Sequence, residues 1–176
     1  MWILNVNVFL TADTHFSHAK VCTFTTPDGS FLRPWRDVDE MDEALVENWN
    51  RVVKPNDKVY HLGDVAIQRK GLQVLDRLNG DKILIKGNHD TFKIADYYPR
   101  FRDIRAYWVM DNYSFSHIPV HPDALMRFKG NVHGHLHAGR VFCEGKIDPR
   151  YLCVCVEQTK YTPIAWEDVK LSFQRL

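Results

Sequence analysis

Nine side chains that can bind metal ions or transfer protons fall in five short clusters along the chain. In order, they are Asp13 and His15; Asp64; Asn88, His89 and Asp90; His117; and His135 and His137. Carboxylate and amide oxygens mixed with imidazole nitrogens suit Mn, Fe, Ni or Zn, whereas structural zinc sites favour thiolates and calcium sites use oxygen alone. The donor set therefore predicts a catalytic metal site.

The elements that must position these clusters are short apolar strands. The segments predicted as buried strands are Val6–Leu10, Val59–Leu62 and Ile83–Ile85, and a polar cluster follows each of them directly. In layered α/β folds, side chains at such strand ends converge on one rim of the sheet, where ligands bind. We therefore expect one shared site.

The number of candidate ligands exceeds what one ion can use. The seven are Asp13, His15, Asp64, Asn88, His117, His135 and His137. An ion of four to six ligands leaves some of them unused, so two ions that share a bridging carboxylate are the economical arrangement. Two metals roughly 3.5–4 Å apart can generate a hydroxide and stabilise charge at phosphorus.

These clusters form a specific pattern when they are taken in order with their glycines. The blocks are Asp13-Thr14-His15, Gly63-Asp64, Gly87-Asn88-His89-Asp90, His117 and Gly134-His135-Leu136-His137. Their order resembles the signature of the calcineurin-like metallophosphoesterase superfamily, across residues 13 to 137. Each block alone is common, but five in order, each after an apolar strand, are specific.

The resemblance implies a role for each residue. It assigns Asp13, His15 and His137 to a first metal, Asn88, His117 and His135 to a second, and Asp64 to the bridge. His89 would protonate the leaving oxygen or stabilise charge on the phosphoryl group, with Asp90 orienting its imidazole. Gly63 and Gly87 would allow the sharp backbone turns that face the ligands inward.

The expected function is hydrolysis of a phosphodiester or nucleotide-type substrate through a hydroxide held by two divalent ions. Mn²⁺ is the favoured metal, with Fe, Ni or Zn as possibilities. A phosphomonoesterase or protein phosphatase would use the same residues. Two less favoured hypotheses are a scaffold of the same fold without catalysis and a nuclease on long nucleic acid. With 23 basic and 22 acidic residues, the chain lacks the overall field for extended nucleic-acid binding.

Several further residues have competing interpretations. His121 is the alternative to His117, which we prefer because it ends a predicted strand. His133 is expected to support the site without binding metal, His18 to lie in a loop, and His61 to be a hydrogen-bonded strand histidine. Arg33 and Arg36 could grip phosphate, although a solvated pair around a packed Trp35 is the preferred interpretation.

The remaining pattern predicts the architecture. Amphipathic spacing predicts helices at Val38–Val52, capped by Asp37 or Asp39, and at Gly71–Leu78. A short terminal helix is expected at Trp166–Phe173. A hairpin through Asp111-Asn112 is expected to join strands, and the predicted later strands are Ile104–Met110, Tyr113–Ser116, Arg140–Glu144 and Tyr151–Glu157. The fold class is α/β (α+β layered), a β-sandwich of mixed sheets flanked by helices, in a single domain over 1–176.

Composition restricts the cellular setting. The segment Met1–Leu10 is apolar but lacks a basic flank and a cleavage site, and no stretch is long enough for a membrane helix. A cytoplasmic protein with a small phosphate-ester or nucleotide substrate is expected. The four cysteines, Cys22, Cys143, Cys153 and Cys155, show no metal-binding spacing, so we expect free thiols, with Cys153 and Cys155 packed in the core.

Overall fold

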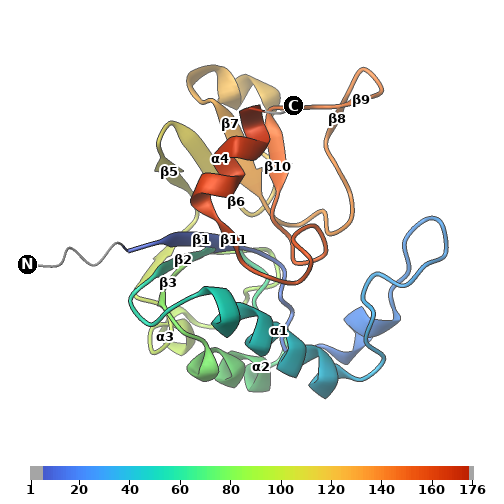
Figure 1. Cartoon of the computed structure of the whole chain (residues 1–176), viewed down its shortest axis with the longest axis vertical. Helices are drawn as coiled ribbons and strands as arrows, with labels where there is room; N and C mark the ends of the chain where they lie inside the picture. The colour runs from blue at the N-terminus through green and yellow to red at the C-terminus, as the bar shows by residue number, and fades with distance from the viewer. Residues whose placement is uncertain (1–5, 175–176) are drawn as a thin grey trace, which may run out of the picture.

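The computed structural model describes residues 6–174 and shows two β-sheets with helices on the outer side of the first (Figure 1). The first sheet has the order β11-β1-β2-β3-β4. Its parallel strands are β1 (Val8–Thr11), β2 (Lys58–His61), β3 (Asp81–Ile85) and β4 (Asp103–Arg105), and β11 (Ile164–Ala165) runs antiparallel at one edge.

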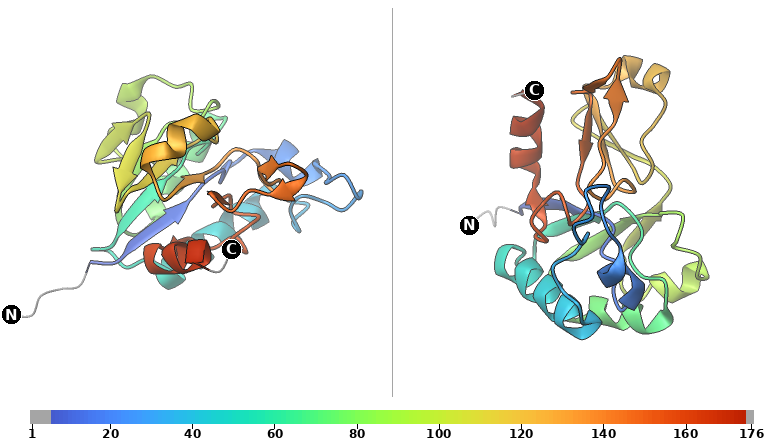
Figure 2. Two further views of the ribbon diagram at one scale, coloured as in Figure 1. Left: turned by 90° about the horizontal axis from the view of Figure 1, so that it is seen from above. Right: turned by 90° about the vertical axis from the view of Figure 1, so that its right-hand side faces the viewer.

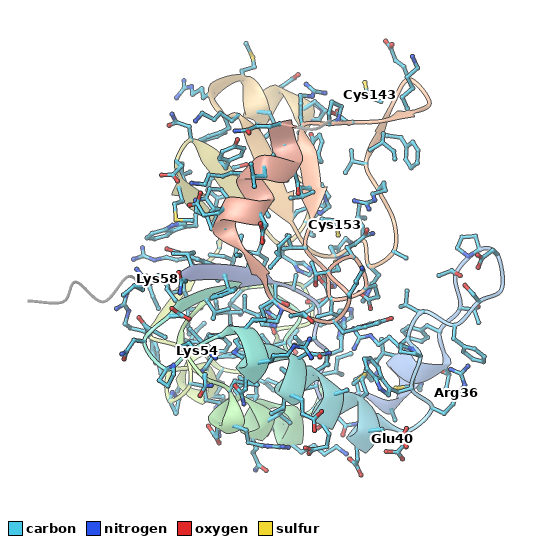
Figure 3. The ribbon with its side chains drawn as sticks, viewed as in Figure 1. Arg36, Glu40, Lys54, Lys58, Cys143 and Cys153 are labelled. Carbon is cyan, nitrogen blue, oxygen red and sulfur yellow. The ribbon has the colours of Figure 1, made fainter. Side chains whose placement is uncertain are left out.

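The second sheet has the order β10-β7-β6-β5. Its strands are β5 (Trp108–Met110), β6 (Tyr113–Ser116), β7 (Gly130–His133) and β10 (Tyr151–Cys153), of which β5 alone is antiparallel to its neighbour. A separate hairpin of β8 (Phe142–Cys143) and β9 (Lys146–Ile147) projects from the body, with Cys143 exposed on it (Figure 3). Two mixed sheets with flanking helices confirm the predicted fold class.

Helices pack on the outer face of the first sheet and along one side of the sandwich (Figure 1). The bounds of the α-helices are α1 (Val38–Val52), α2 (Arg69–Val74), α3 (Ile94–Tyr97) and α4 (Trp166–Gln174), and the 3₁₀ turns are η1 (Ala19–Thr23), η2 (Leu75–Arg77) and η3 (Pro122–Arg127). Asp37 caps α1 by accepting hydrogen bonds from the main-chain N–H groups of Asp39 (2.8 Å) and Glu40 (3.1 Å), as the sequence predicted. No helix in residues 6–174 is long and apolar enough to cross a membrane.

Two hydrophobic cores lie on opposite faces of the first sheet. Phe9 faces the core shared with α1 and α2, while the next residue, Leu10, faces the core between the sheets and α4. Side chains alternate along a strand, so a strand buried on both faces is continuously apolar. This explains why the predicted strands show apolar runs rather than alternation.

The structure corrects several predicted boundaries. The segment Ile104–Met110 is not one strand, because β4 joins the first sheet and β5 the second. The strand predicted at Tyr151–Glu157 ends at Cys153, and a lone bridge then pairs Cys155 with Ala12. The sequence did not predict α3, η3, β7, β9 or β11, which have between two and six residues and are too short to show periodicity. Of the apolar segment at the start, residues 1–5 lie outside the described part.

Parallel pairing brings the ends of the strands together at one edge of the sandwich (Figure 2). Thr11 pairs with His61, and His61 with Leu84, so the loops after β1, β2 and β3 begin side by side. In the second sheet Ser116 pairs with His133. The five predicted clusters therefore emerge at neighbouring positions.

Candidate metal centre

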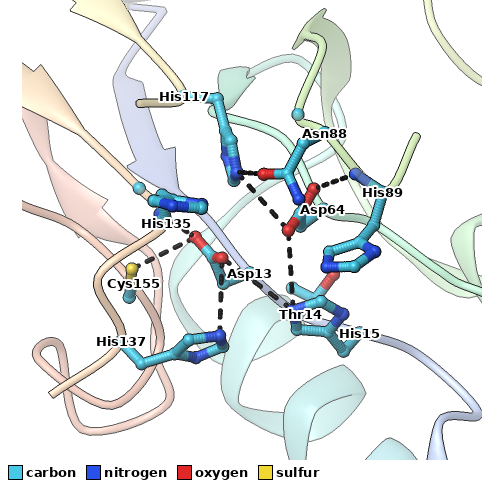
Figure 4. A network of polar contacts seen from close by, with 12 residues as sticks. Asp13, Thr14, His15, Asp64, Asn88, His89, His117, His135, His137 and Cys155 are labelled. Atoms are coloured by element: carbon cyan, nitrogen blue, oxygen red, sulfur yellow. Dashed lines mark hydrogen bonds and ion pairs between the residues drawn. The ribbon is translucent and has the colours of Figure 1, made fainter. Parts of the chain in front are cut away.

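The seven predicted ligands lie together at this edge (Figure 4). Six of them form two groups in which one ligand atom of each residue lies within 4.8 Å of the others: Asp13, His15 and His137 in the first group, and Asp64, His117 and His135 in the second. Asn88 adjoins the second group, because its Oδ1 is 2.9 Å from His117 Nε2. This division is the one that the resemblance implied.

Each aspartate has one anchored oxygen. Asp13 Oδ2 accepts a hydrogen bond from the main-chain N–H of His135 (2.8 Å), and Asp64 Oδ1 accepts one from the main-chain N–H of His89 (2.8 Å). In Asp13, Oδ1 lies 3.9 Å from Nε2 of His15 and 3.8 Å from Nε2 of His137. The anchored oxygens fix both carboxylates so that their other oxygens face the imidazoles.

Asp64 lies between the two groups. Its Oδ2 is 3.8 Å from His15 Nε2 in the first group and 3.4 Å from His117 Nε2 in the second. One carboxylate oxygen therefore faces ring nitrogens of both groups.

The backbone carrying these ligands is strained. Five of the seven adopt the left-handed conformation, with φ of 58° at Asp13, 48° at His15, 56° at Asp64, 69° at His135 and 50° at His137. Such conformations each cost on the order of 1–3 kcal/mol and cluster at functional sites. Here they turn the chain sharply after each strand, so that consecutive ligands point inward.

Two glycines make room for the carboxylates. A Cβ at Gly87 would collide with Oδ1 of Asp64, and a Cβ at Gly134 would lie 2.5 Å from Oδ2 of Asp13. A side chain at either position would displace a candidate ligand. The predicted need for glycine at Gly87 is therefore steric, and Gly63, with φ of 91°, also has the conformational role expected of it.

Two histidines are oriented through their outer ring nitrogen. Nδ1 of His117 lies 2.8 Å from the carbonyl oxygen of Leu62, and Nδ1 of His137 lies 3.0 Å from Oε1 of Glu157. An Nδ1–H that donates to these oxygens leaves Nε2 with its lone pair toward the centre. Metal-binding histidines are commonly fixed in this way.

The charges of the centre are mutually dependent. Burial raises the pKa of Asp13 to about 7, and burial with the nearby Arg33 charge lowers the pKa of His15 to about 2. For Asp64 burial acts in the raising direction, but the hydrogen bond and charge of His117 outweigh it and bring the pKa to about 2. Burial disfavours charge on His117 and His137, yet bonds to Asp64 and Glu157 respectively raise the pKa of each. Burial thus disfavours the negative charge of Asp13, whereas the contact with His117 stabilises that of Asp64.

These features fit divalent cations. Within residues 6–174, Asp13 Oδ1 and His15 Nδ1 are buried without a hydrogen-bond partner. Buried polar atoms are rarely left unpaired, and Asp13 Oδ1 lies in the centre of the first group. Oxygen and imidazole donors in two adjacent groups suit transition-metal ions.

His89 and Asp90 lie beside the centre with different roles. The exposed imidazole of His89 has its centroid 5.8 Å from that of His15, within reach of a molecule at the ligands. The carboxylate of Asp90 accepts hydrogen bonds from the main-chain N–H groups of Asp64 (2.8 Å), Val65 (3.0 Å) and Gly87 (2.8 Å). It therefore ties together two ligand loops, and within the described chain it makes no hydrogen bond to the His89 ring that it was expected to orient.

The remaining histidines lie where the preferred interpretations put them. His121 precedes η3 with 77% of its side chain exposed, whereas His117 is buried in the second group. His133 is buried with Nδ1 2.7 Å from the carbonyl oxygen of Gly134, outside both groups. His61 lies in β2, 3.0 Å from the hydroxyl of Thr14, and His18 precedes η1 beside His15.

Three residues contact the first group in ways that the sequence did not predict. Arg33 was expected to be solvated or to grip phosphate, but it is fully buried and pairs with Glu157, which in turn contacts His137. The thiol of Cys155 lies 3.1 Å from Oδ2 of Asp13, so this cysteine contacts the site besides filling the core. The sequence offered one signal for these contacts. Glu157 is an acidic residue at the end of a predicted strand, which is also where the predicted clusters lie.

Comparison with known proteins agrees with this geometry. The model of the calcineurin-like phosphoesterase family matches residues 6–168, and the chain belongs to this family. It is therefore a phosphoesterase by family, of a class that uses divalent metal ions.

Individual relatives extend over nearly the whole chain. An uncharacterized protein of Methanocaldococcus jannaschii, MJ1445, is 34% identical over 90% of this chain and 86% of its own length. The gene 66 protein of Mycobacterium phage D29 is 30% identical over 93% of this chain and 90% of its own. A solved structure, the protein of unknown function AQ665 from Aquifex aeolicus, superposes with a TM-score of 0.72 at 25% identity, covering 95% and 99% of the two chains.

Proposed function

We propose that this protein hydrolyses a phosphodiester or nucleotide-type substrate at a centre of two divalent ions. The observation that carries the proposal is the position of Asp64, whose Oδ2 faces Nε2 of His15 at 3.8 Å and Nε2 of His117 at 3.4 Å. A single carboxylate oxygen that faces an imidazole nitrogen of each donor group has its simplest explanation as a bridge between two ions.

The proposed ligands follow from the two groups. Asp13, His15 and His137 would hold one ion, Asn88, His117 and His135 the other, and Asp64 both. Mn²⁺ is the first choice, with Fe, Ni or Zn possible for the same donors. When bound, such a pair activates water and stabilises negative charge at phosphorus in an in-line displacement.

The chain's own residues would complete the reaction. His89 is exposed beside His15, so its imidazole can reach the leaving oxygen of a bound ester and donate a proton to it. The main-chain N–H of His89 bonds to Asp64, which ties the position of the proton donor to that of the bridging ligand.

The space beside the second group supports a compact substrate. A hollow of ≈ 350 Å³ opens between the sheets and is lined by Lys86, Gly87, Asn88, Ala106, Ser116, His117 and Ile118. It has room for one substituent of a phosphate ester next to Asn88 and His117. Because the 23 basic and 22 acidic residues give no overall field for a long polyanion, we favour a small diester over a long polymer.

The test compares two chromogenic esters, bis-p-nitrophenyl phosphate and p-nitrophenyl phosphate, on metal-stripped protein with Mn²⁺ restored. We expect Mn²⁺-dependent turnover with the diester as the faster substrate. Faster turnover of the monoester would indicate a phosphomonoesterase with the same centre. Absence of turnover for both would favour a non-catalytic member of the family.

A further inference from the structure

A buried ion pair lies behind the first metal group. Nε of Arg33 is 2.9 Å from Oε1 of Glu157, and their side chains are 0% and 4% exposed. The two residues are separated by 124 positions in the chain, so only the tertiary fold brings them together. Burying two charges costs several kcal/mol per ion before pairing, so such a pair is weak evidence of a purely stabilising role.

Glu157 contacts the first group directly. The oxygen that accepts from Arg33 also lies 3.0 Å from Nδ1 of His137. If Nδ1 carries the proton, Glu157 sets the tautomer of His137, and Nε2 faces Oδ1 of Asp13 at 3.8 Å. The second oxygen, Oε2, is buried without a hydrogen-bond partner in the described chain. A carboxylate selected for stability alone would be fully satisfied.

Arg33 contacts the other ligand segment of the same group. Its guanidinium donates to the carbonyl oxygen of Asp13 at 2.5 Å and to that of Thr14 at 2.8 Å. These carbonyls belong to the left-handed turn from which the side chains of Asp13 and His15 project. The Arg33–Glu157 pair thus contacts the backbone that carries Asp13 and His15 through Arg33, and the ring of His137 through Glu157.

We propose that Arg33 and Glu157 are positioning residues for the first metal group: Glu157 orients His137, and Arg33 fixes Glu157 to the turn that carries Asp13 and His15. This inference rests on the proposed metal centre and assigns the pair a selective effect on one of its two ions. His117 of the second group is oriented by the main-chain carbonyl of Leu62 instead, so that group does not depend on the pair.

The experiment measures Mn²⁺ binding calorimetrically to metal-stripped wild type, Glu157→Gln and Glu157→Asp. Glutamine keeps the shape of the side chain and removes its charge. Aspartate keeps the charge for Arg33 but is one methylene group too short to hold both partners. Glu43→Gln is the matched control, because Glu43 pairs with Arg77 on the exposed surface of α1. Circular dichroism and thermal unfolding establish that each variant is folded, and if one of the two Glu157 variants does not fold, the other decides.

We expect one of two Mn²⁺ ions to bind about 10–100-fold more weakly in the Glu157 variants, the usual effect of losing a partner of a metal-binding histidine. The other ion and the Glu43→Gln protein should be unchanged. His137→Ala should weaken the same ion, and Glu157→Gln added to His137→Ala should cause little further loss, because the two residues act as one unit.

Unchanged affinity for both ions in a folded Glu157 variant would overturn the inference, even if its thermal stability fell. Full additivity with His137→Ala would overturn it as well. A wild-type protein that binds a single ion would contradict the two-ion proposal, and the Glu157 variants would still decide the role of the pair through the affinity of that ion.

Discussion

The two halves of the candidate centre hold corresponding histidines by different means. In the first half, His137 contacts the buried carboxylate of Glu157, whose charge Arg33 balances. In the second half, His117 contacts the main-chain carbonyl of Leu62. The orientation of His137 in the first half therefore depends on two charged side chains. The orientation of His117 in the second half depends on the backbone at the end of a strand.

The halves also differ in their surroundings. Arg33 closes the inner side of the first group, and the second group borders the hollow of ≈ 350 Å³ beside Asn88. If Glu157 orients His137 as proposed, a substitution outside the ligand set should weaken one half selectively.

Replacing Asp64, the residue that both halves share, should have the strongest consequence. Asp64→Ala should abolish turnover and weaken retention of both ions, because its Oδ2 faces His15 and His117. Metal analysis and the chromogenic assay measure the two effects. Asp57→Ala is the control, since Asp57 is equally buried but precedes β2, at the opposite end of the strand. Wild-type turnover in Asp64→Ala would refute the two-ion proposal.

Removing the proposed proton donor, His89, should leave metal binding in both halves unchanged. His89→Ala should keep both ions and lower kcat by a factor on the order of 10²–10⁴, as is usual for a lost acid or base. The exposed His121 provides the matched control, and His121→Ala should behave as wild type. Loss of metal from the His89→Ala protein would mean that His89 is a ligand.

Replacing Asp90 should perturb mainly the second half, whereas replacing Glu157 should perturb the first. Asp90→Ala removes the acceptor for the N–H groups of Asp64, Val65 and Gly87, which holds the loop of Asn88 against the loop of Asp64. We expect the second ion, which uses both Asn88 and Asp64, to bind about 10–100-fold more weakly, the first ion, which uses Asp64 alone, to be weakened less, and stability to fall by about 1–3 kcal/mol. A Mn²⁺ titration and chemical denaturation measure these changes. Equal weakening of both ions would show that the halves are not separable.

The pH dependence of metal binding tests the charges of both halves together. Burial raises the pKa of Asp13 to about 7, and contacts with Asp64 and Glu157 raise the pKa of His117 and His137, so in the metal-free protein all three groups bind protons more readily than the free side chains do. An ion must displace these protons, so affinity should fall by about tenfold per pH unit for each proton displaced as pH drops through 7. Calorimetry in buffers of different ionisation enthalpy counts the protons released. Equal affinity at pH 6 and pH 8 would contradict this assignment of protons.

Local patterns predicted the elements whose interactions are local. The helix Val38–Val52 matches α1 at both ends, because its apolar spacing and its Asp37 cap are properties of consecutive residues. The strand predicted at Ile104–Met110 failed for the opposite reason. Its two halves pair with β3 and β6, which lie in different sheets, and nothing local records the choice of partner.

The fold class and the family could be predicted from the sequence, and so could the meeting of the clusters after the first three apolar strands, because parallel strands end at a common edge. His135 and His137 follow β7, a strand that was not predicted, and were assigned through the resemblance. What surrounds the seven residues depends on packing. The pairing of Arg33 with Glu157 and the bond from His135 to Asp13 join residues 124 and 122 positions apart. Whether a charged side chain is buried, and which partner it meets, depends on tertiary packing. The position of Arg33 in the sequence therefore could not show whether it is solvated or buried behind a metal ligand.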